Sequence, residues 1–196
     1  MEKDLKIDNE KDYEVVKNDK RSKVIYNPKN KKYKKCFYPK FSKRIKWFFK
    51  MGRYPGHNFK YISDVLNTVG IKTVNITDFN KYEVTTQALP GKPLAEVLKE
   101  SNTKKAKMCL GKYINLIKKL IDNRIYFADY TCNNFFMFDG EIYALDLEDY
   151  RKDCLFNFRK KKMLKKMQSK IKTIPKECLE KINITHNDIL KEILDN

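Results

Sequence analysis

Three residues in the segment 126–149 have the types and the spacing that chemistry on a hydroxyl group needs: Asp129, Asn134 and Asp146. Mg²⁺ is a hard ion that takes oxygen ligands, so the Asp146 carboxylate and the Asn134 amide oxygen suit it. A further carboxylate, that of Asp129, can orient a hydroxyl group and take up its proton. A predicted β-hairpin between Asn134 and Asp146 would bring these two side chains back toward one metal site.

The hairpin is predicted from two short apolar runs, 135–138 and 142–145, which are joined by Asp139-Gly140. This dipeptide is typical of the two-residue turn that connects antiparallel strands. A loop, a hairpin and an Asp in this order are rarer than an Asp and an Asn at a given spacing. The alternative is that Asp129 caps a turn and that the acids at 146–149 are an exposed strand end.

The four residues between Asp129 and Asn134 reproduce the spacing of the protein-kinase catalytic loop. The segment further resembles the catalytic region of bacterial lipopolysaccharide core heptose(II) kinases, whose pattern is similar to G-D-x-H-x-x-N-F followed by D-G-x-x-x-I-D-L. The matching residues are Asp129, Asn134-Phe135, Asp139-Gly140 and Leu145-Asp146-Leu147. The resemblance covers roughly residues 13–165. It implies that Asp129 is the catalytic base and that Asn134 and Asp146 hold Mg²⁺.

The resemblance also implies a nucleotide site. Lys35 would contact the α- and β-phosphates of ATP, with Lys34 as a rival, because the alternation of side chains along a strand lets only one of them face a cleft. Gln87 and Leu89 would line the adenine pocket through backbone groups, next to a hinge at 89–91. A kinase lysine usually pairs with a helix Glu, but no acid occurs from 20 to 63. Either Asp64 pairs with Lys35, or Lys35 lacks a carboxylate partner, as in a pseudokinase.

Other positions depart from the family pattern. No glycine-rich loop precedes Lys35, and Ala128 and Thr131 replace the Gly and His that flank the catalytic Asp. Phe127 stands where protein kinases have a His before that Asp. The absent glycine-rich loop, the missing helix Glu and the short length of the chain favour a pseudokinase that keeps the fold as a binding module.

The elements expected around these residues form an α+β, two-lobed protein-kinase-like fold. A flexible N-terminus is expected at 1–12 and an N-lobe at 13–89, a small antiparallel β-sheet with one helix. A mainly helical C-lobe is expected at 90–196, with the catalytic loop and basic C-terminal helices. Strands are predicted at 13–17, 23–26, 32–38, 73–77 and 82–89, and helices at 57–69, 93–100, 104–123 and from about 155 onward, with breaks at Gly70 and Pro175.

Composition limits the class of protein. Aromatic residues make up 13% of the chain and hydrophobic residues 41%, which argues against disorder. Five cysteines without a CxxC pair and two histidines give no zinc motif. The charged N-terminus and the lack of a long apolar run predict a cytoplasmic protein with neither a signal peptide nor a membrane span.

The net charge of +18 favours anionic partners. The stretch 20–53 is free of acids and rich in aromatic residues, among them Trp47, Phe48 and Phe49. Such a stretch fits a peripheral contact with the anionic face of the inner membrane, phosphate contacts with a nucleic acid, or an ordinary solvated surface.

The function expected is that of an ATP- and Mg²⁺-dependent kinase that phosphorylates a sugar hydroxyl, a heptose, of the lipopolysaccharide core. The acceptor would be an anionic glycolipid, which suits the basic chain. A kinase with another acceptor and a pseudokinase are the alternatives. A basic nucleic-acid-binding protein ranks last, and no nucleic-acid partner is expected, because it gives no reason for the arrangement of Asp129, Asn134 and Asp146.

Overall fold

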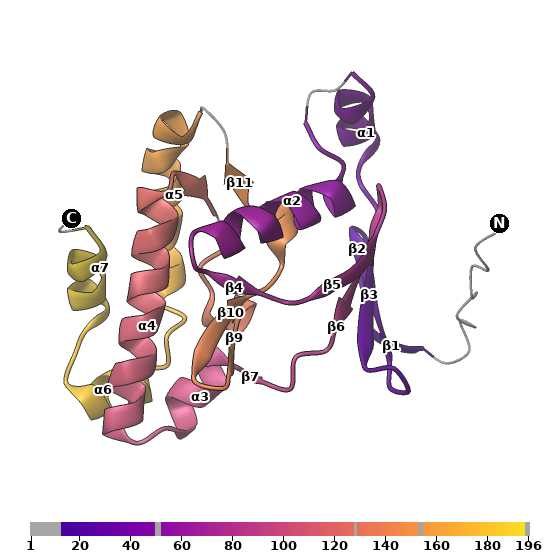
Figure 1. The fold of residues 1–196 in the computed structure, drawn as a ribbon. Coiled ribbons are helices and arrows are strands. Elements are labelled where there is room, and N and C mark those ends of the chain that lie inside the picture. Colours follow the sequence, from indigo (N-terminus) through magenta and orange to yellow (C-terminus); the bar gives the residue numbers. More distant parts are fainter. Residues whose placement is uncertain (1–12, 50–51, 128, 153–154, 195–196) are drawn as a thin grey trace. The chain divides into compact units, whose positions relative to one another are not determined.

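The computed structural model describes residues 13–49, 52–127, 129–152 and 155–194 (Figure 1). The α+β class expected from the sequence is observed. The chain divides into two compact units: unit 1 comprises 1–60 and 75–88, and unit 2 comprises 61–74 and 89–196. Residues 61–74, which were expected in the N-terminal part, therefore group with unit 2. The segment 1–12, expected to be flexible, lies outside the described residues.

Unit 1 contains a five-stranded antiparallel sheet in the order β1-β2-β3-β6-β5. Its strands are β1 (Glu14–Asn18), β2 (Ser22–Asn27), β3 (Lys32–Phe37), β5 (Ile76–Phe79) and β6 (Glu83–Gln87). The turn between β2 and β3 forms because the Asn27 side chain accepts hydrogen bonds from the backbone of Lys29 and Asn30, at 3.0 and 3.3 Å. Val84, at the centre of the sheet, is 1% exposed.

Two helices follow β3: α1 (Phe41–Phe48) and α2 (Pro55–Thr68). Helix α1 was not predicted, whereas α2 matches the predicted helix closely. Helix α2 ends where Gly70 adopts φ +72° and the amide of Ile71 donates to the carbonyl of Leu66 at 2.9 Å. This is the glycine-terminated helix end that Gly70 predicted from the sequence.

The strand predicted at 73–77 is two separate strands. Its first part, β4 (Lys72–Thr73), pairs in parallel with β10 (Glu141–Ala144) within unit 2, and its second part is β5 of unit 1. Residues 74 and 75 lie on either side of the division between the units. Hydropathy could not indicate this division, because both halves have the same β-prone character.

Unit 2 contains a mixed sheet in the order β4-β10-β9-β7, with β7 (Lys92–Pro93) and β9 (Phe135–Phe138). The predicted hairpin is confirmed, because Phe138 pairs with Glu141, and Asp139 and Gly140 both have positive φ, 49° and 70°. A separate ladder pairs β8 (Ile125–Tyr126) with β11 (Arg151–Lys152).

Gly91 lies directly beside the backbone of β9. A Cβ atom at position 91 would come within 2.5 Å of the Met137 carbonyl oxygen. The segment that leads into β7 can therefore reach β9 only because this residue has no side chain.

The described helices that lie wholly in unit 2 are α3 (Leu94–Glu100), α4 (Thr103–Asp122), α5 (Phe156–Ile171), α6 (Lys176–Ile182) and α7 (His186–Leu194). Helix α4 begins at Asn102, whose side chain accepts from the Lys105 amide at 2.9 Å. Helix α4 contacts α3, α6 and α7 and supplies much of the core of the unit (Figure 1). None of the helices among the described residues is long and apolar enough to cross a bilayer.

Candidate active site

The loop that carries Asp129 is held on both sides by backbone pairing with the segment that carries Asp146. Before Asp129, β8 pairs with β11, which follows Asp146. After Asp129, the Asn134 carbonyl accepts from the Leu145 amide at 2.9 Å, next to the β9–β10 hairpin. The three residues singled out in the sequence therefore lie in one part of unit 2.

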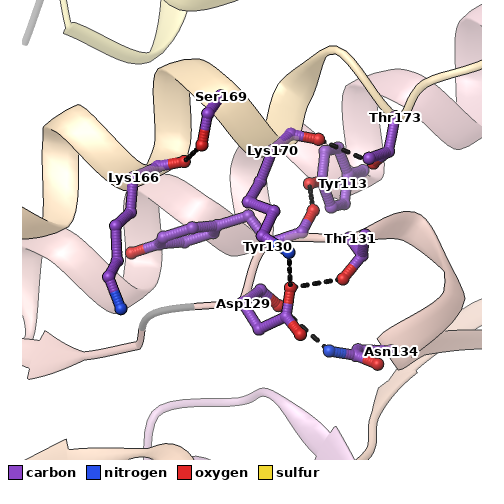
Figure 2. Close-up of polar contacts among 9 residues, drawn as sticks. All are labelled: Tyr113, Asp129, Tyr130, Thr131, Asn134, Lys166, Ser169, Lys170 and Thr173. Carbon is purple, nitrogen blue, oxygen red and sulfur yellow. Dashed lines mark hydrogen bonds and ion pairs between the residues drawn. The ribbon is translucent and has the colours of Figure 1, made fainter.

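Asp129 is surrounded by hydrogen-bond donors (Figure 2). Its Oδ1 accepts from the Thr131 hydroxyl at 2.5 Å and lies 3.2 Å from Nζ of Lys170. Partial burial raises the pKa of Asp129, but the Thr131 hydrogen bond, the Lys170 ammonium and the Asn134 amide outweigh it, so that the pKa is lowered. The carboxylate is therefore ionised at neutral pH, as a base that orients a hydroxyl must be.

Lys170 was not predicted from the sequence. It lies in the last turn of α5, and its side chain is 41% exposed, as is that of Asp129. The sequence indicates only that this segment is a basic helix, and nothing in the sequence between Asp129 and Lys170 signals that the two residues meet. Thr131, which departs from the family pattern, is the second group that contacts the Asp129 carboxylate, as a hydrogen-bond donor.

Asn134 ends a short 3-10 turn, η2 (Cys132–Asn134), and its side-chain Nδ2 donates to the Asp129 carbonyl at 3.2 Å. This hydrogen bond fixes which end of the amide faces the loop. The amide oxygen, the atom that Mg²⁺ prefers, then faces away from Asp129 (Figure 2). The Asn134 side chain therefore presents an amide oxygen, the kind of atom that can serve as a Mg²⁺ ligand.

Asp146 adopts the left-handed backbone conformation, with φ 52° and ψ 47°, at the start of the turn η3 (Leu147–Asp149). This conformation is uncommon for residues other than Gly, although Asp and Asn adopt it more readily than most. The guanidinium of Arg151 donates to the carbonyls of Glu148 and Tyr150, at 2.5 and 2.6 Å, and so holds the turn that follows. These hydrogen bonds stabilise the turn directly after Asp146.

An aromatic cluster underlies the loop. Phe127 stacks on Tyr150 with a centroid distance of 3.8 Å and an interplanar angle of 11°, and it contacts Tyr130 and Phe135 edge to face. All four side chains are fully buried. The Tyr113 hydroxyl of α4 donates to the Tyr130 carbonyl (Figure 2). Phe127, where protein kinases have a His, is thus a core residue of this loop.

The carboxylates of Asp129 and Asp146 both influence the pKa of the buried Tyr150. Burial, followed by the neighbouring Tyr130, Asp146 and Asp129, raises the pKa of Tyr150 well above its usual value. Both carboxylates therefore lie within electrostatic reach of one buried phenol, which stays neutral. Nothing in the sequence distinguished Tyr150 from the other tyrosines of the chain.

The lysine pair of β3 lies in unit 1. Lys34 forms an ion pair with Glu83 of the adjacent strand β6, with 3.2 Å between Nζ and Oε2. Nζ of Lys35 lies 5.6 Å from the centre of the Phe37 ring, on the other face of the strand. The sequence indicated only Asp64, as a possible partner of Lys35. The pairing of Glu83 with Lys34 was not predicted, because strand register determines which residues come together across a sheet.

The remaining predicted residues lie at different places in the chain. Gln87 ends β6, and its side chain donates to the Asn30 and Lys31 carbonyls at 3.4 and 3.1 Å, within unit 1. Leu89 is the first residue of the second segment of unit 2, 89–196. Asp64 is in the part of α2 that belongs to unit 2, so its pairing with Lys35 stays a prediction.

Among the described residues, no group of three or more His, Cys, Asp and Glu side chains is gathered as a metal site. A Mg²⁺ that accompanies a nucleotide needs only one or two protein ligands, because phosphate oxygens and water supply the others. Asn134 and Asp146 suit such a site by the chemistry of their oxygen atoms.

No protein-family model matches this chain, and no curated protein matches it.

Proposed function

We propose that the chain is an ATP-dependent kinase with a two-lobed protein-kinase-like fold. The observation that carries the proposal is the link between the Asp129 loop and the Asp146 segment, made by the β8–β11 pairing and by the Asn134–Leu145 hydrogen bond. An ionised Asp, an oriented Asn amide and a second Asp in one place are what phosphoryl transfer to a hydroxyl requires.

In the proposed reaction, the acceptor oxygen forms a bond to the γ-phosphorus of ATP, the bond from that phosphorus to the β,γ-bridging oxygen breaks, and ADP leaves. Asp129 orients the acceptor hydroxyl and receives its proton. Asn134 and Asp146 would hold Mg²⁺, which would supply positive charge to offset that of the phosphate oxygens. Lys35 contacts the α- and β-phosphates, while Gln87 and Leu89 contribute backbone groups at the adenine.

The proposed acceptor is a sugar hydroxyl of the lipopolysaccharide core. This part of the proposal depends on the resemblance to heptose(II) kinases, and the net charge of +18 supports an anionic acceptor.

The test is Mg²⁺-dependent turnover of ATP by the purified chain, with deacylated lipopolysaccharide core as acceptor. Asp129→Asn and Asp146→Asn each remove one charge, and Asn tolerates the left-handed conformation at position 146. We expect kcat to fall about 10²- to 10⁴-fold in the Asp129 variant and turnover to be lost in the Asp146 variant. The matched control is Asp139→Asn, because Asn-Gly forms the same hairpin turn, and it should retain full activity.

Three results would change the proposal. Equal activity in all three variants would remove Asp129 and Asp146 from the chemistry. Binding of ATP without turnover on any acceptor would favour a pseudokinase. The absence of nucleotide binding, with and without Mg²⁺, would contradict the kinase proposal altogether.

A further inference from the structure

Helix α1 presents an apolar face to solvent. Phe41, Ile45 and Phe48 follow one another at helical spacing, and Phe49 caps the helix. Their exposed fractions are 75%, 42%, 77% and 66%. A row of large apolar side chains on a helix of eight residues is a concentrated apolar surface, unlike the single exposed residues that any protein carries.

A different side of α1 packs against other residues of unit 1. The Trp47 ring lies 5.6 Å from that of Tyr54 and 6.4 Å from that of Tyr82. The Arg44 guanidinium lies 5.7 Å from the Tyr82 ring centre. These contacts fix the rotation of the helix about its own axis, so the exposure of its apolar face is imposed by the fold of unit 1.

The charge around this face has one sign. Lys40, next to the first turn of the helix, and Arg44, within it, are exposed. No Asp or Glu occurs from residue 20 to residue 63. An apolar helix face within a basic segment is complementary to an anionic lipid surface, where apolar side chains enter the acyl boundary and cations meet phosphates.

We propose that α1 is an in-plane anchor, which binds the chain to an anionic bilayer surface through Phe41, Ile45, Phe48 and Phe49. The proposal is independent of the kinase chemistry, because it needs neither nucleotide nor acceptor. A second copy of the chain fits this face less well, since it would bring two basic segments together. A nucleic acid fits less well because the aliphatic Ile45 lies within the aromatic row and offers no stacking surface.

The expected strength of vesicle binding follows from the apolar and cationic side chains of α1. Each phenylalanine that leaves water contributes roughly a factor of ten to partitioning, and each cation near an anionic surface contributes about a factor of five. Replacement of all three phenylalanines by Ala should therefore weaken vesicle binding by about a thousandfold. Because these side chains are exposed and Ala favours helix, the variant should fold normally.

The experiment is co-sedimentation of the full chain, without nucleotide, with vesicles of phosphatidylglycerol and phosphatidylcholine or of phosphatidylcholine alone. The triple variant Phe41→Ala, Phe48→Ala and Phe49→Ala is compared with Phe158→Ala, a control on the basic helix α5 that is 85% exposed in the wild type. Trp47, the one tryptophan of the chain, reports a fluorescence change on binding. Its emission in the free variant reports whether unit 1 has folded.

We expect binding to anionic vesicles that falls with added salt, is lost in the triple variant and is retained in the Phe158 control. Equal loss in both variants, or equal binding to both vesicle types, would overturn the proposal. It would also be overturned by a dimer in analytical ultracentrifugation that only the triple variant disperses. Tighter binding to single-stranded RNA than to vesicles, lost in the same variant, would assign the face to nucleic acid instead.

Discussion

The pairing of Lys170 with Asp129 predicts a specific effect of Lys170→Met. At 3.2 Å, two unit charges attract by about 1.3 kcal/mol in water and by about 5 kcal/mol at an effective dielectric constant of 20. Both side chains are 41% exposed, so screening by water dominates. Entropy and desolvation reduce the net contribution to about 0.5 kcal/mol. The melting temperature of the variant should thus fall by about 1–2 °C.

Lys170→Met should have a larger effect on how stability and kcat/KM depend on pH. Lys170 is one of the groups that lower the pKa of Asp129, so its removal raises that pKa. A lowered carboxylate pKa stabilises the folded state above the unfolded pKa, and this contribution is lost as the pH falls through the folded pKa. The variant should therefore lose less stability on acidification. If Asp129 is the base, the acidic limb of kcat/KM against pH should move to higher pH.

The assay is the pH profile of ATP turnover, with thermal unfolding over the same pH range. Lys166→Met, one turn earlier on α5, removes the same charge and should leave the acidic limb in place. Lys170→Arg should restore it. An unmoved limb in Lys170→Met would refute the reasoning, and a loss of about a hundredfold at every pH would instead place Lys170 on the transferred phosphate.

Three further predictions concern packing and the nucleotide site. Gly91→Ala should destabilise the chain by about 1–3 kcal/mol, because the new Cβ meets the β9 carbonyl at 2.5 Å. Gly111→Ala should instead stabilise it by about 0.5–1 kcal/mol, because nothing lies within 4 Å of a Cβ at this position in α4. Denaturant midpoints of both variants equal to that of the wild type would contradict both expectations. Phe127→Ala should cost about 3–5 kcal/mol in chemical denaturation, since it empties a fully buried stacked position, and a cost under about 1 kcal/mol would show that the loop does not depend on this ring. Lys35→Ala should raise the KM for ATP more than Lys34→Ala, and the reverse order in steady-state kinetics would assign the phosphate contact to Lys34.

The elements that local sequence specifies were predicted well. The hairpin of β9 and β10 follows from Asp139-Gly140, because few dipeptides adopt positive φ at both positions. The end of α2 follows from Gly70 for the same reason. Helix α4 follows from its apolar periodicity. In each case, the determining interactions lie within one or two turns of chain, where residue spacing is a direct guide.

Helix α1 and the division of the predicted strand at 73–77 were missed for a different reason. Helix α1 has apolar residues at helical spacing, but it is only eight residues long, so the period repeats over little more than two turns and is hard to distinguish from chance. Strands β4 and β5 join different sheets. The choice of sheet depends on partners far away in sequence, which residue type does not encode.

The candidate site divides in the same way. The sequence by itself determined the residue types and the loop–hairpin order of Asp129, Asn134 and Asp146. Only the tertiary structure decided that Lys170 meets Asp129, that Glu83 pairs with Lys34, and that Tyr150 lies near both carboxylates. These contacts arise from the docking of helices and the register of strands. Both are set by burial of the whole core, which no short stretch of sequence specifies.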